Sequence, residues 1–244
     1  SRVYLRAEFS RLLESLGKIT GRSPGPEDLA ESIALYNRSR ARLREAYRKH
    51  QEEPAVWTAD NVRMVLSSSL RARREDHLKW MDALPWEESS TGPDDRIPIY
   101  VRGKVWDPPG IARLLDELHL LVVRDDMVTG YRAIEMDAPL DGDPLAALVE
   151  RHISTVPYTG YHVEPSSLVQ GFVNRVRESG ARGVIFLNPK FCEAAAFDTP
   201  DLQKALDNEN IPGLILETSA RGIALEQLRT RLEAFREMIA GDLP

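Results

Sequence analysis

The chain has 244 residues, of which 42% are hydrophobic and 29% are charged, and its formal net charge is −6. This length allows one large domain or two smaller ones, and the composition is typical of a globular protein rather than a disordered one. The acidic balance and the lack of an apolar run near the roughly 18–20 residues that span a bilayer favour neither a nucleic acid nor a membrane as a partner. A single cysteine excludes an internal disulfide framework and suits a reducing compartment, so we expect a cytoplasmic protein.

The first third of the chain predicts helices, because apolar residues recur there at helical spacing. We expect four of them, over residues 3–16, 26–51, 58–70 and 74–84. The second helix carries five arginines, namely Arg38, Arg40, Arg42, Arg44 and Arg48. Such a run resembles a nucleic-acid patch, but the acidic balance elsewhere favours a solvated face or an ion-pairing subunit contact.

A polar run over residues 87–95 ends this helical part and is the best internal boundary. We therefore predict a helical linker or interface region over residues 1–92 and an α/β domain over residues 93–244. In the second part, predicted strands and helices alternate: strands over 97–101, 120–123, 184–187 and 214–216, and helices over 109–118, 144–153, 167–179, 199–208 and 225–239. This alternation favours a doubly wound, mainly parallel four-stranded sheet with helices on both faces.

The carboxyl ends of parallel strands meet at one edge of the sheet, where such folds build their sites. Polar segments follow the four predicted strands, over residues 102–107, 124–132, 188–193 and 217–222. Together they bring cations, carboxylates and the only thiol, Cys192, to this edge. The sequence therefore predicts a site for an anionic or polar ligand beside Cys192.

Several of these residues also have a purely structural explanation. Cys192 follows a strand, yet a lone cysteine is often just a small buried hydrophobe. Asp125 and Asp126 suit a cation site, although paired acids before a turn more often act as caps. Gly130 permits either the close approach of a ligand or a positive φ. His162 is either an acid–base group or an ordinary surface histidine.

Four segments resemble a known enzyme family. Residues 190–193, Lys-Phe-Cys-Glu, resemble its Lys-Phe-Cys-Asp-Pro loop after a strand, and residues 211–217, Ile-Pro-Gly-Leu-Ile-Leu-Glu, resemble its Ile-Pro turn and next strand. Residues 230–235, Thr-Arg-Leu-Glu-Ala-Phe, resemble its terminal helix, and residues 125–132 fit its Asp-Asp…Thr-Gly-x-Arg loop. The chain thus resembles the C-terminal portion of a subunit of the 2-hydroxyacyl-CoA dehydratase and benzoyl-CoA reductase family.

In that family, each subunit of a heterodimer holds an iron–sulfur cluster, usually [4Fe–4S], through three cysteines. The resemblance implies that Cys192 is a metal ligand and that the cluster needs two further cysteines not in this chain. It therefore also implies that the α/β domain over residues 93–244 lies on the side of the iron–sulfur cluster. It also implies a homologous second subunit, an ATP-dependent activator that donates electrons, and an acyl-CoA substrate. By position alone, Lys190 is placed to stabilise a negatively charged cluster or thioester enolate, and Arg124, Arg132 and Arg221 are placed to meet the phosphates of CoA.

Three departures from the family pattern bear on the activity. The two further ligand cysteines are absent from this chain. Val128 stands where many dehydratases have cysteine, and Glu193-Ala194 replaces the usual Asp-Pro after the thiol. Val128 and Tyr131 tilt the prediction towards a benzoyl-CoA-reductase-like subunit, in which electrons enter an aromatic acyl-CoA one at a time. The alternatives are a 2-hydroxyacyl-CoA dehydratase subunit, which works through a ketyl radical, and a non-catalytic scaffold subunit with an inert thiol. Because two ligands are missing, we expect the chain to be part of a longer polypeptide and inactive alone.

Overall fold

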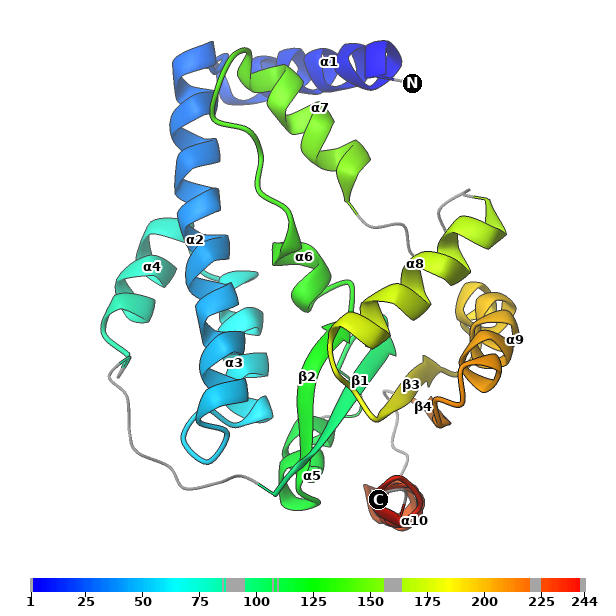
Figure 1. The fold of residues 1–244 in the computed structure, drawn as a ribbon. Helices are drawn as coiled ribbons and strands as arrows, with labels where there is room; N and C mark the ends of the chain where they lie inside the picture. Colours follow the sequence, from blue (N-terminus) through cyan, green and yellow to red (C-terminus); the bar gives the residue numbers. More distant parts are fainter. Residues whose placement is uncertain are drawn as a thin grey trace.

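The computed structural model describes residues 2–84, 86, 95–106, 108, 110–155, 164–219 and 225–241. Its centre is a four-stranded, all-parallel sheet in the order β2-β1-β3-β4. Helices cover both faces of this sheet and also form the N-terminal part of the molecule (Figure 1), which confirms the predicted fold class. In the part of the chain described here, no helix is both long and apolar enough to cross a bilayer.

The elements follow the predicted order closely. The strands are β1 (Ile97–Gly103), β2 (Leu120–Asp126), β3 (Gly183–Pro189) and β4 (Gly213–Thr218). The helices before the sheet are α1 (Arg2–Thr20), α2 (Pro26–Glu52), α3 (Ala59–Ser69) and α4 (Arg74–Asp82). The helices that follow are α5 (Ile111–Glu117), α6 (Tyr131–Glu135), α7 (Pro144–Ser154), α8 (Pro165–Glu178), α9 (Glu193–Asn208) and α10 (Leu225–Gly241).

Two helices differ from the prediction. The sequence gives no signal for the short helix α6, and α9 begins at Glu193 rather than at the predicted residue 199. Pro200 explains the second error, because proline favours the first turn of a helix and so suggests a start beside it. In the structure Pro200 lies inside α9, and the preceding alanines already form the first turns. The early start places the N-terminus of α9 directly after Cys192.

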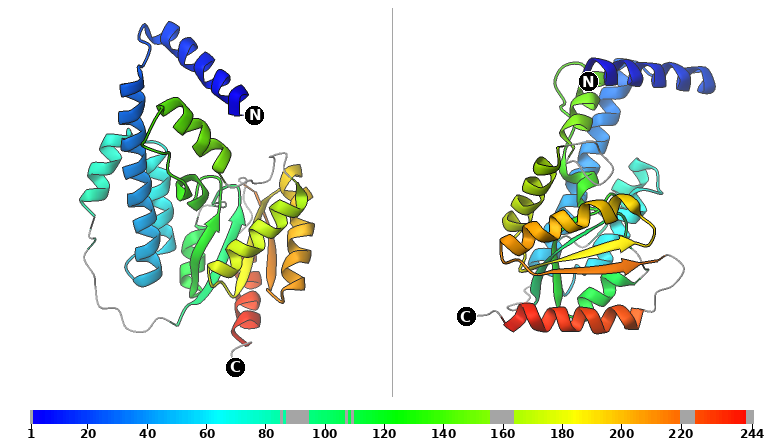
Figure 2. Two further views of the ribbon diagram at one scale, coloured as in Figure 1. Left: turned by 45° about the horizontal axis from the view of Figure 1, so that its top comes forward. Right: turned by 90° about the vertical axis from the view of Figure 1, so that its right-hand side faces the viewer.

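The two faces of the sheet bury different helices. Ile99 and Val101 of β1 pack with α5 and α10 on one face, whereas Tyr100 between them packs with α8 and α9 on the other. This alternation follows from the opposite directions of successive side chains in a strand. Figure 2, right, shows α9 in orange and α10 in red on opposite sides of the strands.

The arginines of α2 form ion pairs within the molecule. Arg40 and Arg44 both bind the carboxylate of Asp137, at 3.0 and 2.7 Å. These two arginines are therefore engaged within the chain, and the predicted ion-pairing subunit contact stays a prediction. α2 also packs against α6 and α7, so the helical part and the α/β part share contacts. Residues 87–94 lie outside the described part of the chain, and the boundary at residue 92 stays a prediction.

The sheet order defines where a ligand would bind. From β1 the chain crosses through α5 to β2 on one side, and then returns through α6, α7 and α8 to β3 on the other side. The strand order thus reverses between β1 and β3. In doubly wound sheets, ligands bind outside the carboxyl ends of the strands at this point.

Candidate functional site

Cys192 follows β3 at the reversal of the strand order, on the edge where the sequence predicts a site. The ammonium group of Lys104 and the backbone N–H of Ala195, in the first turn of α9, lie near its thiol and favour its charged form. Partial burial raises the pKa of the Cys192 thiol, but these two donors outweigh it, and the pKa lies below its ordinary value. The thiol is partly exposed, unlike a buried structural cysteine.

Lys104 belongs to the polar segment 102–107 that the sequence places at this edge, but the prediction did not single it out as a site residue. It is the first residue after β1, at the same edge of the sheet as Cys192, and this position is the signal that could have identified it. Lys190, which was predicted, is exposed and its backbone N–H donates to the carbonyl of Thr218 at 2.8 Å. Between Lys190 and Cys192, Phe191 is fully exposed and has a left-handed φ of 62°. The chain therefore turns sharply between β3 and α9.

One thiolate does not complete a cluster site. A [4Fe–4S] cluster is held by several cysteine thiolates, and Cys192 is the only cysteine in the sequence. No group of three or more His, Cys, Asp or Glu side chains that could hold a metal ion occurs among the residues with a described placement. The sequence can therefore supply only one of the cysteine ligands that an iron–sulfur cluster requires, namely Cys192. The ligand role of Cys192 stays a prediction, and no chemical step is assigned to a cluster on this chain alone.

A buried ion-pair cluster joins the ends of β1 and β2. Arg102 in β1 and Arg132 in α6 both donate to the carboxylate of Asp126 in β2, and the three side chains are 3–7% exposed. Burial raises the pKa of Asp126, but the two guanidinium groups outweigh it and hold that pKa below its ordinary value. The guanidinium of Arg102 also lies 5.1 Å from the centre of the Phe172 ring in α8.

The residues of this ion-pair cluster show that two strands extend further than predicted. The sequence prediction ended them at residues 101 and 123 because polar residues follow, but β1 continues to Gly103 and β2 to Asp126. Arg102 and Asp126 stand opposite each other in the ladder, so each supplies the charge that makes burial of the other tolerable. The polar segment after each strand is accordingly shorter than predicted.

Asp125 holds the turn between β2 and α6. Its Oδ1 accepts hydrogen bonds from the backbone N–H groups of Met127 and Tyr131, at 3.0 and 2.9 Å, and its Oδ2 accepts one from the hydroxyl of Tyr47. These contacts support the capping alternative for Asp125. Burial raises the pKa of Asp125 to about 6, although the hydrogen bond from Tyr47 opposes the shift.

Gly130 packs directly against this carboxylate. Its φ is −116°, so the positive-φ alternative is wrong. A Cβ at Gly130 would lie 2.0 Å from Oδ1 of Asp125 and 2.8 Å from Cβ of Met127. The close approach that requires glycine is therefore made by the chain's own carboxylate.

The raised pKa of Asp125 gives a testable pH dependence. In an unfolded chain the pKa of an aspartate is about 4, so between about pH 4 and the folded value of about 6 the folded state binds more protons. The contribution of Asp125 to the free energy of unfolding therefore falls as the pH rises through this window. We expect Asp125→Asn to remove a fall on the order of 2 kcal/mol. Urea denaturation across this range would measure it.

The exposed Asp141, between α6 and α7, provides the control for this measurement. Asp141→Asn should leave the pH dependence of the wild-type protein unchanged. A constant difference between wild type and Asp125→Asn from pH 4 to pH 6 would show that the buried carboxyl group does not titrate as described.

The predicted phosphate-binding arginines occupy different environments. Arg124 pairs with Glu135 and lies 4.7 Å from the centre of the Tyr131 ring. Arg132 is buried in the cluster around Asp126. Arg221 and His162 lie outside the described residues. Contact of these arginines with CoA stays a prediction.

Comparison of the sequence with models of known protein families assigns the chain to a family. The family model for the 2-hydroxyglutaryl-CoA dehydratase D-component matches residues 1–239. The chain belongs to this family. The family membership inferred from the motifs around Cys192 and the terminal helix is thereby confirmed.

Named relatives within the dehydratase D-component family include subunits of dehydratases and of a reductase. The chain is 27% identical over 237 residues to the beta subunit of (R)-2-hydroxyglutaryl-CoA dehydratase of Acidaminococcus fermentans, covering 95% of this chain and 62% of that protein. It is 24% identical to the (R)-phenyllactyl-CoA dehydratase beta subunit of Clostridium sporogenes, covering 97% and 63%. It is 23% identical to a benzoyl-CoA reductase subunit of Thauera aromatica, with the same coverage of 97% and 63%. The chain thus spans somewhat less than two thirds of the length of these relatives.

Proposed function

We propose that this chain is part of a subunit of a multisubunit enzyme that acts on an acyl-CoA thioester. The observation that carries the proposal is the family match over residues 1–239. Its relatives are named as subunits of acyl-CoA dehydratases and of a reductase, which supports a homologous partner subunit. An ATP-dependent activator that donates electrons and a cytoplasmic location belong to the same proposal.

Two reactions fit this family. Reductive dearomatisation of benzoyl-CoA is supported by Val128, which is 36% exposed beyond β2 and has no atom that could bind iron. Dehydration of a 2-hydroxyacyl-CoA is supported equally, by the description of the family and by the dehydratase relatives. Incubation of the activated complex with benzoyl-CoA and, separately, with a 2-hydroxyacyl-CoA distinguishes them, because only one substrate should be consumed.

In this proposal the chain contributes one cysteine ligand for iron and the charged and polar groups that surround its thiol. Cys192 would bind iron, and an iron–sulfur cluster, when bound, supplies one-electron chemistry. The ammonium of Lys104 and the N-terminus of α9 stabilise the negative charge of the thiolate. Lys190 stays the predicted contact for a negatively charged cluster or thioester.

Replacing the thiol tests the ligand role directly. In the native complex with its partner subunit, we expect Cys192→Ala to abolish or destabilise one cluster of roughly four irons. Anaerobic iron and sulfide analysis together with EPR spectra would measure the loss. Phe197→Ala is a matched control, because Phe197 is 86% exposed on the same helix α9 and should leave the iron content unchanged.

The opposite result would favour the scaffold alternative. If the native complex contained no iron after reconstitution, or if Cys192→Ala kept the full iron content, the thiol would not be a cluster ligand. The chain would then serve as a non-catalytic subunit with an inert cysteine.

A further inference from the structure

A pocket of about 330 Å³ lies between α3 and two loops that leave the carboxyl edge of the sheet. α3 and the turn after it contribute Arg63, Ser67 and Arg71, which are spaced four residues apart and so lie along one side. The loops after β1 and β2 contribute Trp106 and Thr129. A second hollow of about 420 Å³ shares the three residues of the α3 side. The space suits part of a small ligand.

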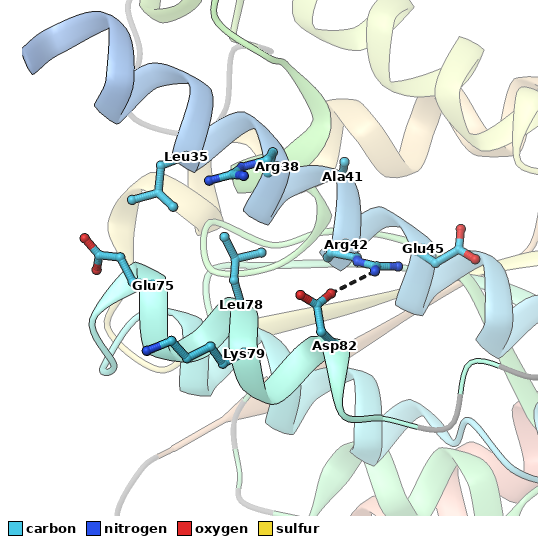
Figure 3. Close-up of a pocket in the computed structure, with 9 residues that line it drawn as sticks. All are labelled: Leu35, Arg38, Ala41, Arg42, Glu45, Glu75, Leu78, Lys79 and Asp82. Atoms are coloured by element: carbon cyan, nitrogen blue, oxygen red, sulfur yellow. Dashed lines mark hydrogen bonds and ion pairs between the residues drawn. The ribbon is translucent and has the colours of Figure 1, made fainter. Parts of the chain in front are cut away.

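The charge of this pocket differs from that of the larger pocket between α2 and α4. The charged lining of the larger pocket comprises three cations and three carboxylates: Arg38, Arg42, Lys79, Glu45, Glu75 and Asp82. Figure 3 shows Arg42 reaching across to Asp82, at 2.8 Å. The pocket beside α3 has two guanidinium groups and, among the described residues that line it, no carboxylate. It therefore favours an anion, whereas the larger pocket is balanced.

Arg71 carries the charge that is available to a ligand. Arg63 already pairs with Asp60 at 2.8 Å, so its charge is partly compensated. Arg71 is exposed and forms no ion pair with any described residue. The hydroxyl groups of Ser67 and Thr129 line the same space. Guanidinium and hydroxyl donors together suit the oxygen atoms of a phosphate.

Trp106 adds a flat aromatic surface to the lining of the pocket. The indole and the neighbouring Leu70 provide apolar surface for a planar heterocycle, which stacks well on aromatic rings. Phosphate donors beside an aromatic platform are the combination that a nucleotide requires.

The pocket is linked to the candidate site by one loop. Trp106 lies two residues after Lys104, whose ammonium group lies near the thiol of Cys192. The carbonyl of Lys104 accepts a hydrogen bond from the backbone N–H of Val128 at 3.1 Å, which ties the two loops together. A ligand that carries a phosphorylated nucleotide at one end and a thioester at the other matches this arrangement.

We propose that the pocket formed by Arg63, Arg71, Trp106 and Thr129 binds the phosphorylated adenosine end of an acyl-CoA. The assignment rests on the proposed action on acyl-CoA thioesters, and it adds the place where the nucleotide is held. Arg71 binds a phosphate group, the indole of Trp106 packs against the adenine ring, and the thioester end extends along the sheet edge towards Lys104 and Cys192.

Binding of matched ligands to the native complex tests this assignment. The probes are an acyl-CoA, the corresponding acyl-pantetheine, which lacks the nucleotide, and ATP. We expect Arg71→Ala to weaken acyl-CoA binding roughly tenfold, as the loss of one charge-assisted contact implies. Acyl-pantetheine should bind Arg71→Ala and wild type equally well. Trp106→Ala removes the aromatic surface and should also weaken acyl-CoA binding, by a smaller factor.

Arg38→Ala provides the matched control, because Arg38 is an exposed arginine of the balanced pocket between α2 and α4. It should bind acyl-CoA as wild type does. Equal acyl-CoA binding by Arg71→Ala and wild type would overturn the assignment, as would an equal loss of acyl-CoA and acyl-pantetheine binding. Binding of ATP to wild type as tight as that of acyl-CoA would show that the pocket serves another nucleotide. The proposed function fails separately, if the activated wild-type complex converts no CoA thioester.

Discussion

Asp126→Asn should lower the free energy of unfolding by about 3–5 kcal/mol, because it removes the carboxylate that pairs with two buried arginines. Asparagine keeps the size of the side chain but not its charge. Arg102 and Arg132 would then face each other across a neutral group, with little water to screen their repulsion. Chemical denaturation of the wild-type and variant chains, monitored by circular dichroism, would measure the change.

Asp82→Asn is the control for this experiment. Asp82 also pairs with an arginine, Arg42, but the two side chains are 59% and 42% exposed. Exposed pairs contribute about 0–1 kcal/mol, so this variant should unfold almost as wild type does. A similarly small effect for Asp126→Asn would mean that water or another anion reaches the cluster in solution.

Gly130→Ala is the second substitution with a large expected effect. The added methyl group would overlap the carboxylate of Asp125 and the side chain of Met127, at 2.0 and 2.8 Å. Relief of this overlap requires the turn between β2 and α6 to move, and the hydrogen bonds that Asp125 accepts would lengthen. We expect a loss of about 2–3 kcal/mol in the free energy of unfolding, in the upper part of the range for overpacking. Denaturant titration measures it.

Gly171→Ala in α8 serves as the matched glycine control. There, the nearest atom to an added Cβ is Nη1 of Arg175 at 3.2 Å, at the end of a flexible side chain. Alanine is also preferred over glycine inside a helix, by about 0.5–1 kcal/mol. Gly171→Ala should therefore be neutral or stabilising. Equal stability of Gly130→Ala and wild type would contradict the tight packing of the turn.

Asp126→Asn and Gly130→Ala probe the same part of the molecule, the carboxyl end of β2 and the turn that follows it. Asp125 and Asp126 are consecutive residues at the end of β2, and they fix the turn to α6 and the end of β1, respectively. Lys104 and Trp106 follow β1 directly. The buried carboxylates thus hold the loops from which the candidate site is built. Loss of either should disturb ligand binding as well as stability.

The sequence predicted the position of the thiol better than its surroundings. An apolar run followed by Asn188-Pro189 predicted that β3 ends just before Cys192, and the structure confirms this position at the sheet edge. No local pattern indicated that Lys104, 88 residues earlier in the chain, would lie beside the thiol. Partners so distant along the chain are set by the strand order, and the parallel pairing of β1 with β3 brings these two together.

Local patterns in the sequence determined most helices, the four strands, the parallel α/β class and the family, because these depend on apolar spacing and on short motifs. Only the tertiary structure decided how far β1 and β2 extend and what surrounds Cys192. Arg102 and Asp126 resemble loop residues when each is considered alone. Each becomes a buried strand residue because the other, on the neighbouring strand, compensates its charge. That compensation depends on a pairing in space, which no local pattern contains.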